Sequence, residues 1–311
     1  MRVYQLTQAT DNAHRDCVVT LGNFDGCHRG HAQLISRLVQ KSKALGVSAV
    51  VITFHPYPSE YFQPNKPFIR LQRFSEKLAW FADRGVDTVV CLRFNAALAH
   101  LPAETFIQRF LHEQWRAYHV IVGDDFRFGA RRAGDVRLLQ SMGERLGFTV
   151  EQLSTFEYAR ERVSSTRIRA ALVNSDLATA KQLLGRHYSI TARVCHGDKR
   201  GREWGYPTVN LPLFRQHPPL KGVFAVAVVG EDFEAQGVAS VGFRPVFELD
   251  QPLLEVFLLD FNREIYGQRL RVDFLMWLRE ETDFDSVTSL INQIEADVNS
   301  ARDFFRLRKL S

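Results

Sequence analysis

Two histidines, His28 and His31, lie three residues apart in a glycine-bearing segment that reads GNFDGCHRGH over residues 22–31. A β-branched run precedes this segment and apolar residues at helical spacing follow it as far as Gly46, which predicts a turn between a strand and a helix. Such a turn directs backbone N–H groups and the positive end of the helix at one point, and its glycines let a phosphate approach the backbone. Both imidazoles can donate to the same phosphate, although a histidine pair here is also a common way to cap a helix.

A second candidate phosphate site begins at Ser164, where the sequence reads SSTRIR. Three hydroxyls and two guanidiniums precede a helical segment, and such groups at a helix start bind anions well. The same residues could act only as a helix cap with solvated arginines. If both motifs bind phosphate, they would suit opposite ends of a triphosphate.

The segment 123–129 reads GDDFRFG and follows an expected strand. A plain loop would be polar, whereas this one places the acidic Asp125 beside the aromatic Phe126 and Phe128. An aromatic-lined cleft at this point would suit a flat ring as ligand.

Three polar residues in the second half of the chain could bind a cation or move a proton. Glu255 interrupts the apolar run 253–261, where a carboxylate requires either a function or a solvated strand face. Thr208 and Asn210 lie two apart on a strand-like segment and therefore project to one side. Oxygen ligands of this kind suit Mg²⁺.

The elements that must position these residues change in character near residue 185. Before it, strand-like runs alternate with helical stretches, one of them at 74–84, which predicts a parallel sheet wound with helices. Ligands bind beyond the carboxyl ends of the strands in such sheets. The expected strands are 17–21, 49–54, 88–92 and 119–122.

After residue 185, short strands separated by glycine and proline turns predict a small antiparallel barrel. A final helix, capped by Asp285 or Ser286, would place an apolar stripe on that barrel. The expected strands are 188–194, 222–229, 237–241, 253–261 and 268–274, and the stripe consists of Val287, Leu290, Ile291, Ile294 and Val298.

The composition limits the classes of protein that remain. The chain has 311 residues, of which 45% are hydrophobic and 24% charged, enough for a globular protein of two domains. It has no apolar run of eighteen residues and no secretory signal, which predicts a cytoplasmic protein without a membrane partner. Its four scattered cysteines indicate neither a zinc site nor disulfides. The net charge of +5 is dispersed and fits polyanionic small ligands as well as nucleic acid.

Taken together, GNFDGCHRGH, TFHPYP, GDDFRFG and SSTRIR occur in the order and spacing of the prokaryotic bifunctional riboflavin kinase/FAD synthetases. The sequence also resembles that family in its second half, most specifically in GYPTVN at residues 205–210. The resemblance implies an α/β protein with an N-terminal doubly wound, Rossmann-like nucleotidyltransferase domain at 1–184. A C-terminal antiparallel β-barrel riboflavin kinase domain with a terminal helix would occupy 185–311.

The resemblance implies two ATP-dependent reactions, phosphorylation of riboflavin to FMN and adenylyl transfer to FMN that gives FAD and pyrophosphate. In adenylyl transfer the attacking phosphate is already an anion, so positioning and charge neutralisation suffice. His28 and His31 would be catalytic there, and Asp125, Phe126 and Phe128 would lie near the flavin. The implied ATP-binding residues of this reaction are Gly22, Asn23, Phe24, Asp25, His28, His31, Ser164, Ser165, Thr166 and Arg167.

Phosphorylation of riboflavin differs because a hydroxyl must lose a proton as it attacks the γ-phosphate. The resemblance implies Glu255 as the base, with Mg²⁺ held by Thr208 and Asn210. ATP would also contact Gly201, Arg202, Gly205 and Pro207. Phe243 and Val246 replace threonines that relatives usually have, a change that would alter affinity if those hydroxyls touch substrate.

Two rival hypotheses remain open at this point. One is a monofunctional FMN adenylyltransferase whose kinase-like barrel is inactive, and the other is a nucleic-acid-binding protein with a basic barrel. The second would leave Glu255 and the GYPTVN motif without a role, so we expect small-molecule substrates and no nucleic acid. The sequence leaves self-association open.

Overall fold

The computed structural model describes residues 1–6, 16–197, 200–213, 217–246 and 249–309. The chain divides into two compact units, one formed by residues 1–68 and 72–165 and the other by 69–71 and 166–311. None of the helices within the described ranges is long and apolar enough to cross a membrane.

The first unit contains a six-stranded parallel sheet in the order β1-β4-β3-β2-β5-β6. This confirms the predicted parallel α/β sheet and each of its expected strands. The sequence analysis missed β1 and β6, the two edge strands. The strands are β1 (Arg2–Leu6), β2 (Cys17–Leu21), β3 (Ser48–His55), β4 (Thr88–Arg93), β5 (Ala117–Gly123) and β6 (Thr149–Leu153).

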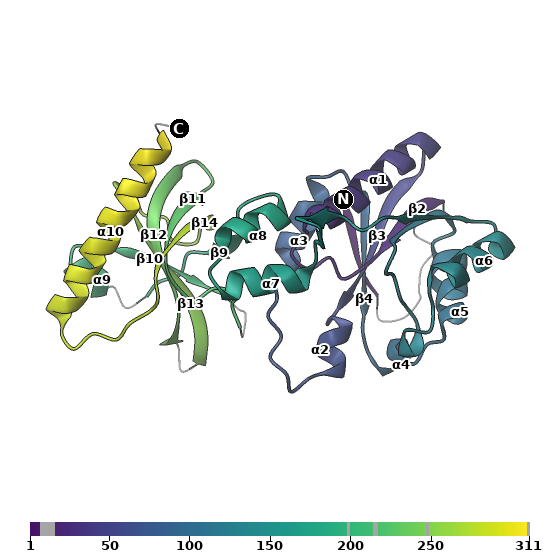
Figure 1. Ribbon diagram of the computed structural model, residues 1–311, viewed down its shortest axis with the longest axis horizontal. Coiled ribbons are helices and arrows are strands. Elements are labelled where there is room, and N and C mark those ends of the chain that lie inside the picture. The colour runs from purple at the N-terminus through teal and green to yellow at the C-terminus, as the bar shows by residue number, and fades with distance from the viewer. Residues whose placement is uncertain (7–15, 198–199, 214–216, 247–248, 310–311) are drawn as a thin grey trace. The chain divides into compact units, whose positions relative to one another are not determined.

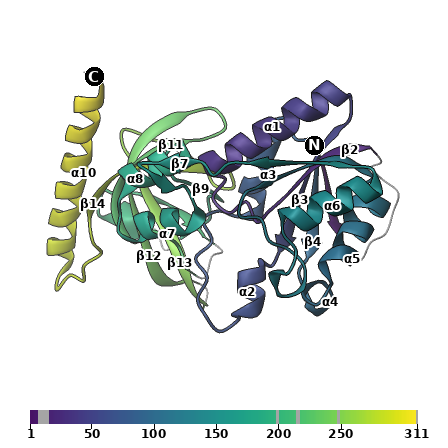
Figure 2. The ribbon, with the colours of Figure 1, turned by 45° about the vertical axis from the view of Figure 1, so that its right-hand side comes forward.

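Helices cover both faces of this sheet (Figures 1 and 2). Leu34, Ile35 and Leu38 of α1 pack with Phe81 of α3 on one face, while η1 and α6 pack on the other. The helix predicted at 74–84 is present and ends at Ala82. The bounds are α1 (Arg29–Leu45), α2 (Pro58–Phe62), α3 (Phe74–Ala82), α4 (Ala96–Ala99), α5 (Ala103–Phe106), the π-helix η1 (Ile107–Gln114), the 3₁₀ turn η2 (Ala130–Arg132) and α6 (Val136–Leu146), with a hairpin of β7 (Glu157–Tyr158) and β8 (Glu161–Arg162).

The second unit is the predicted antiparallel barrel, with strand order β10-β13-β12-β11-β14-β9. A bridge between Cys195, just after β9, and Asn210 of β10 joins the two ends of the sheet. The elements are α7 (Ser165–Val173), α8 (Leu177–Leu184), β9 (Ser189–Arg193), α9 (Arg200–Glu203), β10 (Thr208–Pro212), β11 (Gly222–Val229), β12 (Glu234–Val246), β13 (Leu249–Leu258), β14 (Arg269–Arg279) and α10 (Val287–Lys309).

The final helix α10 lies along the outside of the barrel (Figure 1). Ser286 caps it, because its Oγ accepts the Ser289 backbone N–H at 3.1 Å. The prediction of an apolar stripe on this helix is confirmed only in part. Ile294 and Val298 pack on the barrel as expected, but the contact continues to Ala301 and Phe305. Val287, by contrast, is 53% exposed, because the first turn of the helix lies beyond this contact.

Candidate active sites

The strand order of the first unit reverses its direction of winding at β2. From β2 the chain winds outward through β3 and β4, then returns to the other side of β2 as β5 and β6. Open α/β sheets bind ligands at the carboxyl ends of the strands where the winding reverses. The carboxyl ends of β2 and β5 lead into the segments 22–28 and 123–129, so the fold brings these two predicted segments to one edge.

His28 and His31 form a reciprocal cap at the start of α1. The Nδ1 atom of His28 accepts the His31 backbone N–H at 3.3 Å, and the Nδ1 atom of His31 accepts the His28 backbone N–H at 3.3 Å. The rings stack with centroids 3.5 Å apart and an interplanar angle of 15°. Because both Nδ1 atoms accept, the proton of each neutral imidazole is on Nε2. The cap therefore gives both rings an N–H donor on the edge away from the backbone.

Buried side chains surround the turn that precedes this cap. Phe24, at a positive φ of 49°, packs its ring edge-on against Phe81 and lies 5.1 Å from the His31 ring. Its ring is thus part of the core and supports His31 from behind. Asp25 is only 2% exposed, and its Oδ1 accepts the Tyr57 hydroxyl at 3.3 Å. This contact holds the Asp25 carboxylate against Tyr57, so Asp25 helps to order the turn.

Three side chains to which the sequence analysis gave no role hold the same turn. They are Lys77, Tyr57 and Gln72. Lys77 Nζ donates to the Asn23 carbonyl at 2.6 Å and to the Tyr57 hydroxyl at 2.8 Å. Gln72 Nε2 donates to the Phe24 carbonyl at 3.1 Å. One signal was available, because Lys77 lies three residues from Phe74 and four from Phe81, on the apolar face of its helix.

The two halves of the SSTR sequence belong to different units. Ser165 Oγ donates to the Asp25 carbonyl at 2.8 Å, so the start of this motif contacts the histidine-bearing turn. Ser164 directly precedes Ser165 in the chain. Thr166 and Arg167 follow on the second unit. Their predicted role in ATP binding stays a prediction.

The loop after β5 is held by polar contacts at its start and by aromatic packing at its end. The Asp124 carboxylate accepts from the Thr155 hydroxyl at 2.7 Å, and this bond lowers the pKa of Asp124. Asp125 forms an ion pair with Arg162 at 2.5 Å. Phe126 stacks on Phe128 at 5.3 Å, and Phe128 continues into the core. The predicted flavin residues therefore form one loop, at the same edge of the sheet as the histidine-bearing turn.

Another aromatic group lies at the carboxyl ends of β3 and β4. The rings of Tyr61, Phe62 and Phe94 pack edge-on against one another, with centroids 5.3–5.7 Å apart. Phe62 is 61% exposed, which is unusual for phenylalanine. The sequence analysis did not select these residues because they come from α2 and from the end of β4, which only the fold brings together.

In the second unit, the predicted kinase residues form a row across three strands. Asn210 of β10 pairs with Glu255 of β13, and Glu255 pairs with Ser240 of β12. Directly opposed residues share a face of the sheet. This face is the outer one, because Phe257 and Val238, which form the next pair on the same side, pack in the cluster that α10 covers. Thr208 lies two residues before Asn210 on the same side.

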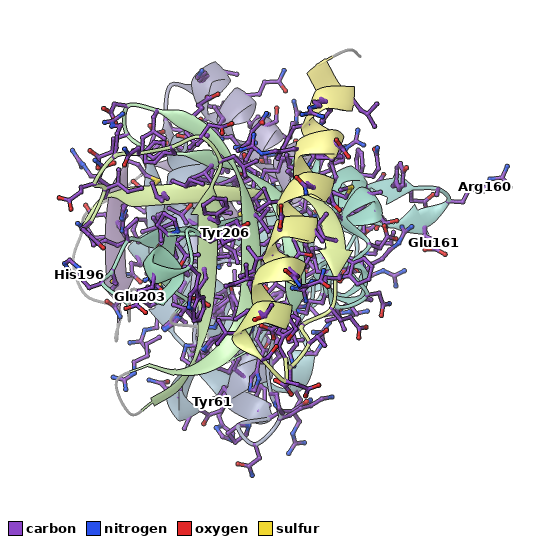
Figure 3. All side chains as sticks on the ribbon, turned by 90° about the vertical axis from the view of Figure 1, so that its left-hand side faces the viewer. Tyr61, Arg160, Glu161, His196, Glu203 and Tyr206 are labelled. Atoms are coloured by element: carbon purple, nitrogen blue, oxygen red, sulfur yellow. The ribbon has the colours of Figure 1, made fainter. Side chains whose placement is uncertain are left out.

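Glycines let the segment before β10 pack closely over this row. A Cβ on Gly197 would meet Asn210 Nδ2 at 2.3 Å, and one on Gly201 would meet the Tyr206 carbonyl at 2.4 Å. Gly205 adopts a positive φ of 84°, and the exposed Pro207 follows two residues later. Tyr206, labelled in Figure 3, packs against the cluster that α10 covers. The side chains of Arg202, Phe243 and Val246 lie outside the described part of the chain.

The donors in this row fit Mg²⁺ in their chemistry. The Thr208 hydroxyl, the Asn210 amide oxygen and the Glu255 carboxylate are hard oxygen ligands, and Thr208 is exposed while the other two are half-buried. In the described ranges no group of three or more His, Cys, Asp and Glu side chains is arranged to hold a metal. A cation held by Thr208 and Asn210 would therefore have neutral side-chain oxygens as ligands, with the Glu255 carboxylate as the charged group of the row.

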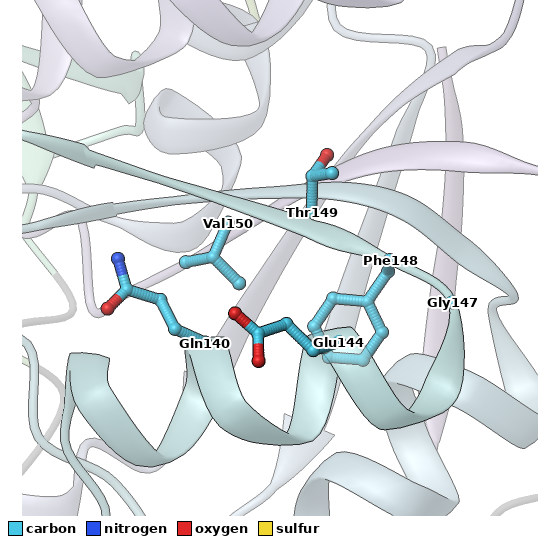
Figure 4. A pocket seen from close by; sticks show the side chains of 7 residues that line it. Gln140, Glu144, Gly147, Phe148, Thr149 and Val150 are labelled. Atoms are coloured by element: carbon cyan, nitrogen blue, oxygen red, sulfur yellow. The ribbon is translucent and has the colours of Figure 1, made fainter.

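A hollow at the surface of the first unit contains none of the predicted site residues. It has a volume of about 620 Å³ and lies between α6 and β6 of the first unit, where Gln140, Glu144 and Thr149 line it (Figure 4). It is an open surface depression. The arrangement of functional groups, rather than the size of a hollow, therefore defines the candidate sites.

A doubly wound sheet with a paired-histidine helix start, followed by a barrel with an acid–amide–hydroxyl row, defines a two-unit enzyme that transfers phosphate-containing groups. Family models match both parts, FAD synthetase at residues 10–167 and riboflavin kinase at 184–305. The chain belongs to the bifunctional riboflavin kinase/FMN adenylyltransferase family.

Individual relatives agree with this membership. The bifunctional riboflavin kinase/FMN adenylyltransferase of Escherichia coli K12 is 42% identical over 308 residues, which cover 99% of this chain and 97% of the relative. The Pseudomonas fluorescens protein of the same name is 44% identical over 290 residues, 93% of each chain. The crystal structure of a Streptococcus pneumoniae protein described as a macrolide-efflux protein has a TM-score of 0.85 at 31% identity, and the match covers 97% of this chain and 99% of that one.

Proposed function

We propose that the two reactions of this bifunctional riboflavin kinase and FMN adenylyltransferase are divided between its two units. The chain makes FMN from riboflavin and ATP, and FAD from FMN and ATP. The first unit would carry out adenylyl transfer and the second the phosphorylation of riboflavin. The observation that carries this division is the contrast between the stacked, capped histidines on α1 and the Asn210–Glu255 pair on the barrel.

For adenylyl transfer, we assign the ATP phosphates to the turn 22–28 and the start of α1. The Nε2–H groups of His28 and His31 would donate to phosphate oxygens, and the positive end of the helix would add to their effect. Ser164 and Arg167 would bind further phosphate oxygens. The FMN phosphate attacks as an anion, so no side chain needs to remove a proton. The flavin ring would bind against Phe126, with the Asp125 carboxylate at its edge.

For the kinase reaction, we assign the base to Glu255. Its carboxylate would accept the proton of the riboflavin hydroxyl as that hydroxyl attacks the γ-phosphate. Thr208 and Asn210 would hold Mg²⁺, which when bound neutralises charge on the phosphates. Gly201, Gly205 and Pro207 would let the ATP chain pass close to the backbone, and Arg202 would bind its phosphates.

The boundary between the two functional domains would lie at 184/185. The start of the riboflavin kinase match at residue 184 supports this position. The compact units divide earlier, at 165/166, because α7 and α8 cluster with the barrel. We further propose a cytoplasmic location, on the ground that both reactions consume ATP.

A product assay on the whole chain tests the division of labour. Wild-type protein is incubated with Mg-ATP and either riboflavin or FMN, and the flavins are separated by chromatography. We expect Glu255→Gln to lose FMN formation by about 10²- to 10⁴-fold while it still converts supplied FMN to FAD. His31→Ala should form FMN and fail to make FAD.

Matched variants control for unspecific damage. Glu264→Gln and His100→Ala change exposed residues of the same types and should leave both reactions unchanged. If Glu255→Gln keeps kinase activity, the assignment of the base is wrong. If the wild-type chain converts only supplied FMN, the barrel is inactive and the enzyme is monofunctional.

A further inference from the structure

Lys77 is a fully buried cation that no step of the two reactions uses. It is 1% exposed, although lysine is almost never fully buried unless it is paired. It lies on α3, whose other inward residues, such as Phe81, belong to the apolar core. A leucine or methionine at this helical position would pack without the cost of burying a charge, so the lysine calls for a specific explanation.

Lys77 contacts the histidine-bearing turn directly and through Tyr57. Its Nζ donates to the Asn23 carbonyl at 2.6 Å and to the Tyr57 hydroxyl at 2.8 Å, and it lies 4.6 Å from the centre of the Tyr57 ring. The Tyr57 hydroxyl in turn donates to Asp25 Oδ1 at 3.3 Å. The ammonium and the carboxylate are therefore linked through one hydroxyl, an arrangement that satisfies two buried charges together.

This network connects three segments that are far apart in the sequence. Asn23 and Asp25 belong to the turn, Tyr57 belongs to the TFHPYP segment, and the Asp25 carbonyl accepts the hydroxyl of Ser165. All of these contacts lie within the first unit. The turn leads directly into the His28–His31 cap, so the position of both imidazole donors depends on where Asn23 and Asp25 are held.

We propose that Lys77 is a positioning residue for adenylyl transfer, whose buried positive charge fixes the turn 23–25 and thereby the two histidine donors. The proposal rests on the role of His28 and His31 stated under the proposed function. Electrostatic catalysis depends on donors that are held in place before the reaction. A displacement of catalytic groups by about 1 Å costs about 100-fold in rate.

The test replaces Lys77 in the full-length chain and restores its charge from solution. Lys77→Ala removes three methylene groups and the ammonium, which n-propylammonium matches in size and charge. We expect kcat for adenylyl transfer to fall about 100-fold with a much smaller change in KM for ATP, and added n-propylammonium to recover at least tenfold. The matched control is 1-propanol, which has the same length but no charge and should not restore activity.

Two further variants keep the test decisive. Lys77→Met fills the same space without charge, so it carries the test if Lys77→Ala does not fold, and it should show the same loss of kcat. Tyr57→Phe removes one acceptor and leaves the Asn23 contact, so its loss should be smaller. Thermal unfolding and near-ultraviolet circular dichroism check that each variant is folded.

The possible outcomes separate this proposal from the one on which it rests. Full adenylyl transfer by folded Lys77→Met, or equal rescue by 1-propanol, would overturn the charge-dependent role of Lys77. Retention of adenylyl transfer by His31→Ala would instead overturn the proposed role of the histidines. A loss in Lys77→Met with rescue of Lys77→Ala by the amine alone supports the proposal.

Discussion

The first unit encloses its histidine-bearing turn in buried side chains, whereas the second unit displays its candidate ligands on an outward strand face. Asp25 and Lys77 are almost wholly buried behind the turn. Thr208, by contrast, is exposed, and Asn210 and Glu255 are half-buried on the barrel. The difference corresponds to the chemistry that we assign. A reaction that needs only fixed donors benefits from rigidity, and one that moves a proton needs a carboxylate that substrate and solvent can reach.

The largest effect that can challenge this comparison concerns His28, which acts both as helix cap and as proposed phosphate donor. Asparagine is a good N-cap residue, so His28→Asn should keep the acceptor for the His31 N–H while it removes the Nε2 donor. We expect adenylyl transfer to fall about 100-fold with unchanged stability. His28→Ala should lose the activity and also about 1 kcal/mol of stability.

Urea unfolding and the FMN-to-FAD assay together separate the two roles of His28. Riboflavin phosphorylation by the same samples serves as the internal control. An active His28→Asn would mean that His28 is only a cap, and the rigid turn would then need another donor. Loss of stability in His28→Asn would mean that asparagine does not reproduce the cap.

The histidine pair shows which features of the site could be predicted from the sequence and which could not. The motif allowed two readings, a cap or a phosphate donor, and they appeared to compete. The structure shows that the cap contacts use Nδ1 on both rings, which leaves the proton on Nε2. Only the ring geometry reveals this, because the spacing of two histidines does not specify which nitrogen faces the backbone.

The elements that were missed share a physical cause. The sequences of β1 and β6, RVYQL and TVEQL, mix polar with apolar residues because an edge strand is paired on one side only and is partly exposed. The buried strands β2 to β5 were predictable from their β-branched runs. Lys77 was visible on an apolar helix face, but its partners are 20 and 54 residues away in the sequence. Helical periodicity gives the side of a helix and not the group that it meets.

A second effect, on stability and not on rate, concerns how α10 is held on the outer face of the barrel. Arg279, at the end of β14, binds the buried carboxylate of Asp297 on α10 through two nitrogens, at 2.8–3.0 Å. Removal of one partner from a buried pair leaves an uncompensated charge. We expect Asp297→Ala to lower the free energy of unfolding of the second unit by about 3 kcal/mol, with adenylyl transfer unchanged at moderate temperature.

The matched control is another ion pair on the same helix. Asp303 and Arg306 are both largely exposed, so Asp303→Ala should leave stability unchanged within error. Urea titrations that follow riboflavin kinase activity measure the second unit specifically. Equal stability of the two variants would show that α10 is held by its apolar contacts alone. The barrel would then owe its fixed outer face to packing and not to this ion pair.

The smallest expected effect is on the pH dependence of stability and concerns His119, a histidine of the first unit with a structural role. His119 is buried on β5, with Nδ1 2.6 Å from Thr149 Oγ1 and Nε2 3.2 Å from Glu151 Oε2. Burial lowers the pKa of His119 below its usual value of 6.5, although the bond to Glu151 opposes this change. The unfolded chain therefore takes up this proton more readily than the folded one. The stability contributed by the neutral ring is complete above about pH 6.5 and is lost as the pH falls through the lower folded pKa.

We expect His119→Asn to flatten the dependence of the unfolding free energy on pH as the pH falls below about 6.5. His100→Asn, which changes an exposed histidine of the same unit, should keep the wild-type slope. Part of the slope should remain in His119→Asn, because burial also lowers the pKa of His187 in the second unit. Hydrogen bonds from Arg37 lower the pKa of Glu151, so a separate loss of stability should begin only below about pH 4.5. If the unfolding free energy of His119→Asn depends on pH as it does in the wild type, folding does not lower the pKa of His119. The stability of the first unit would then not depend on the protonation of this ring.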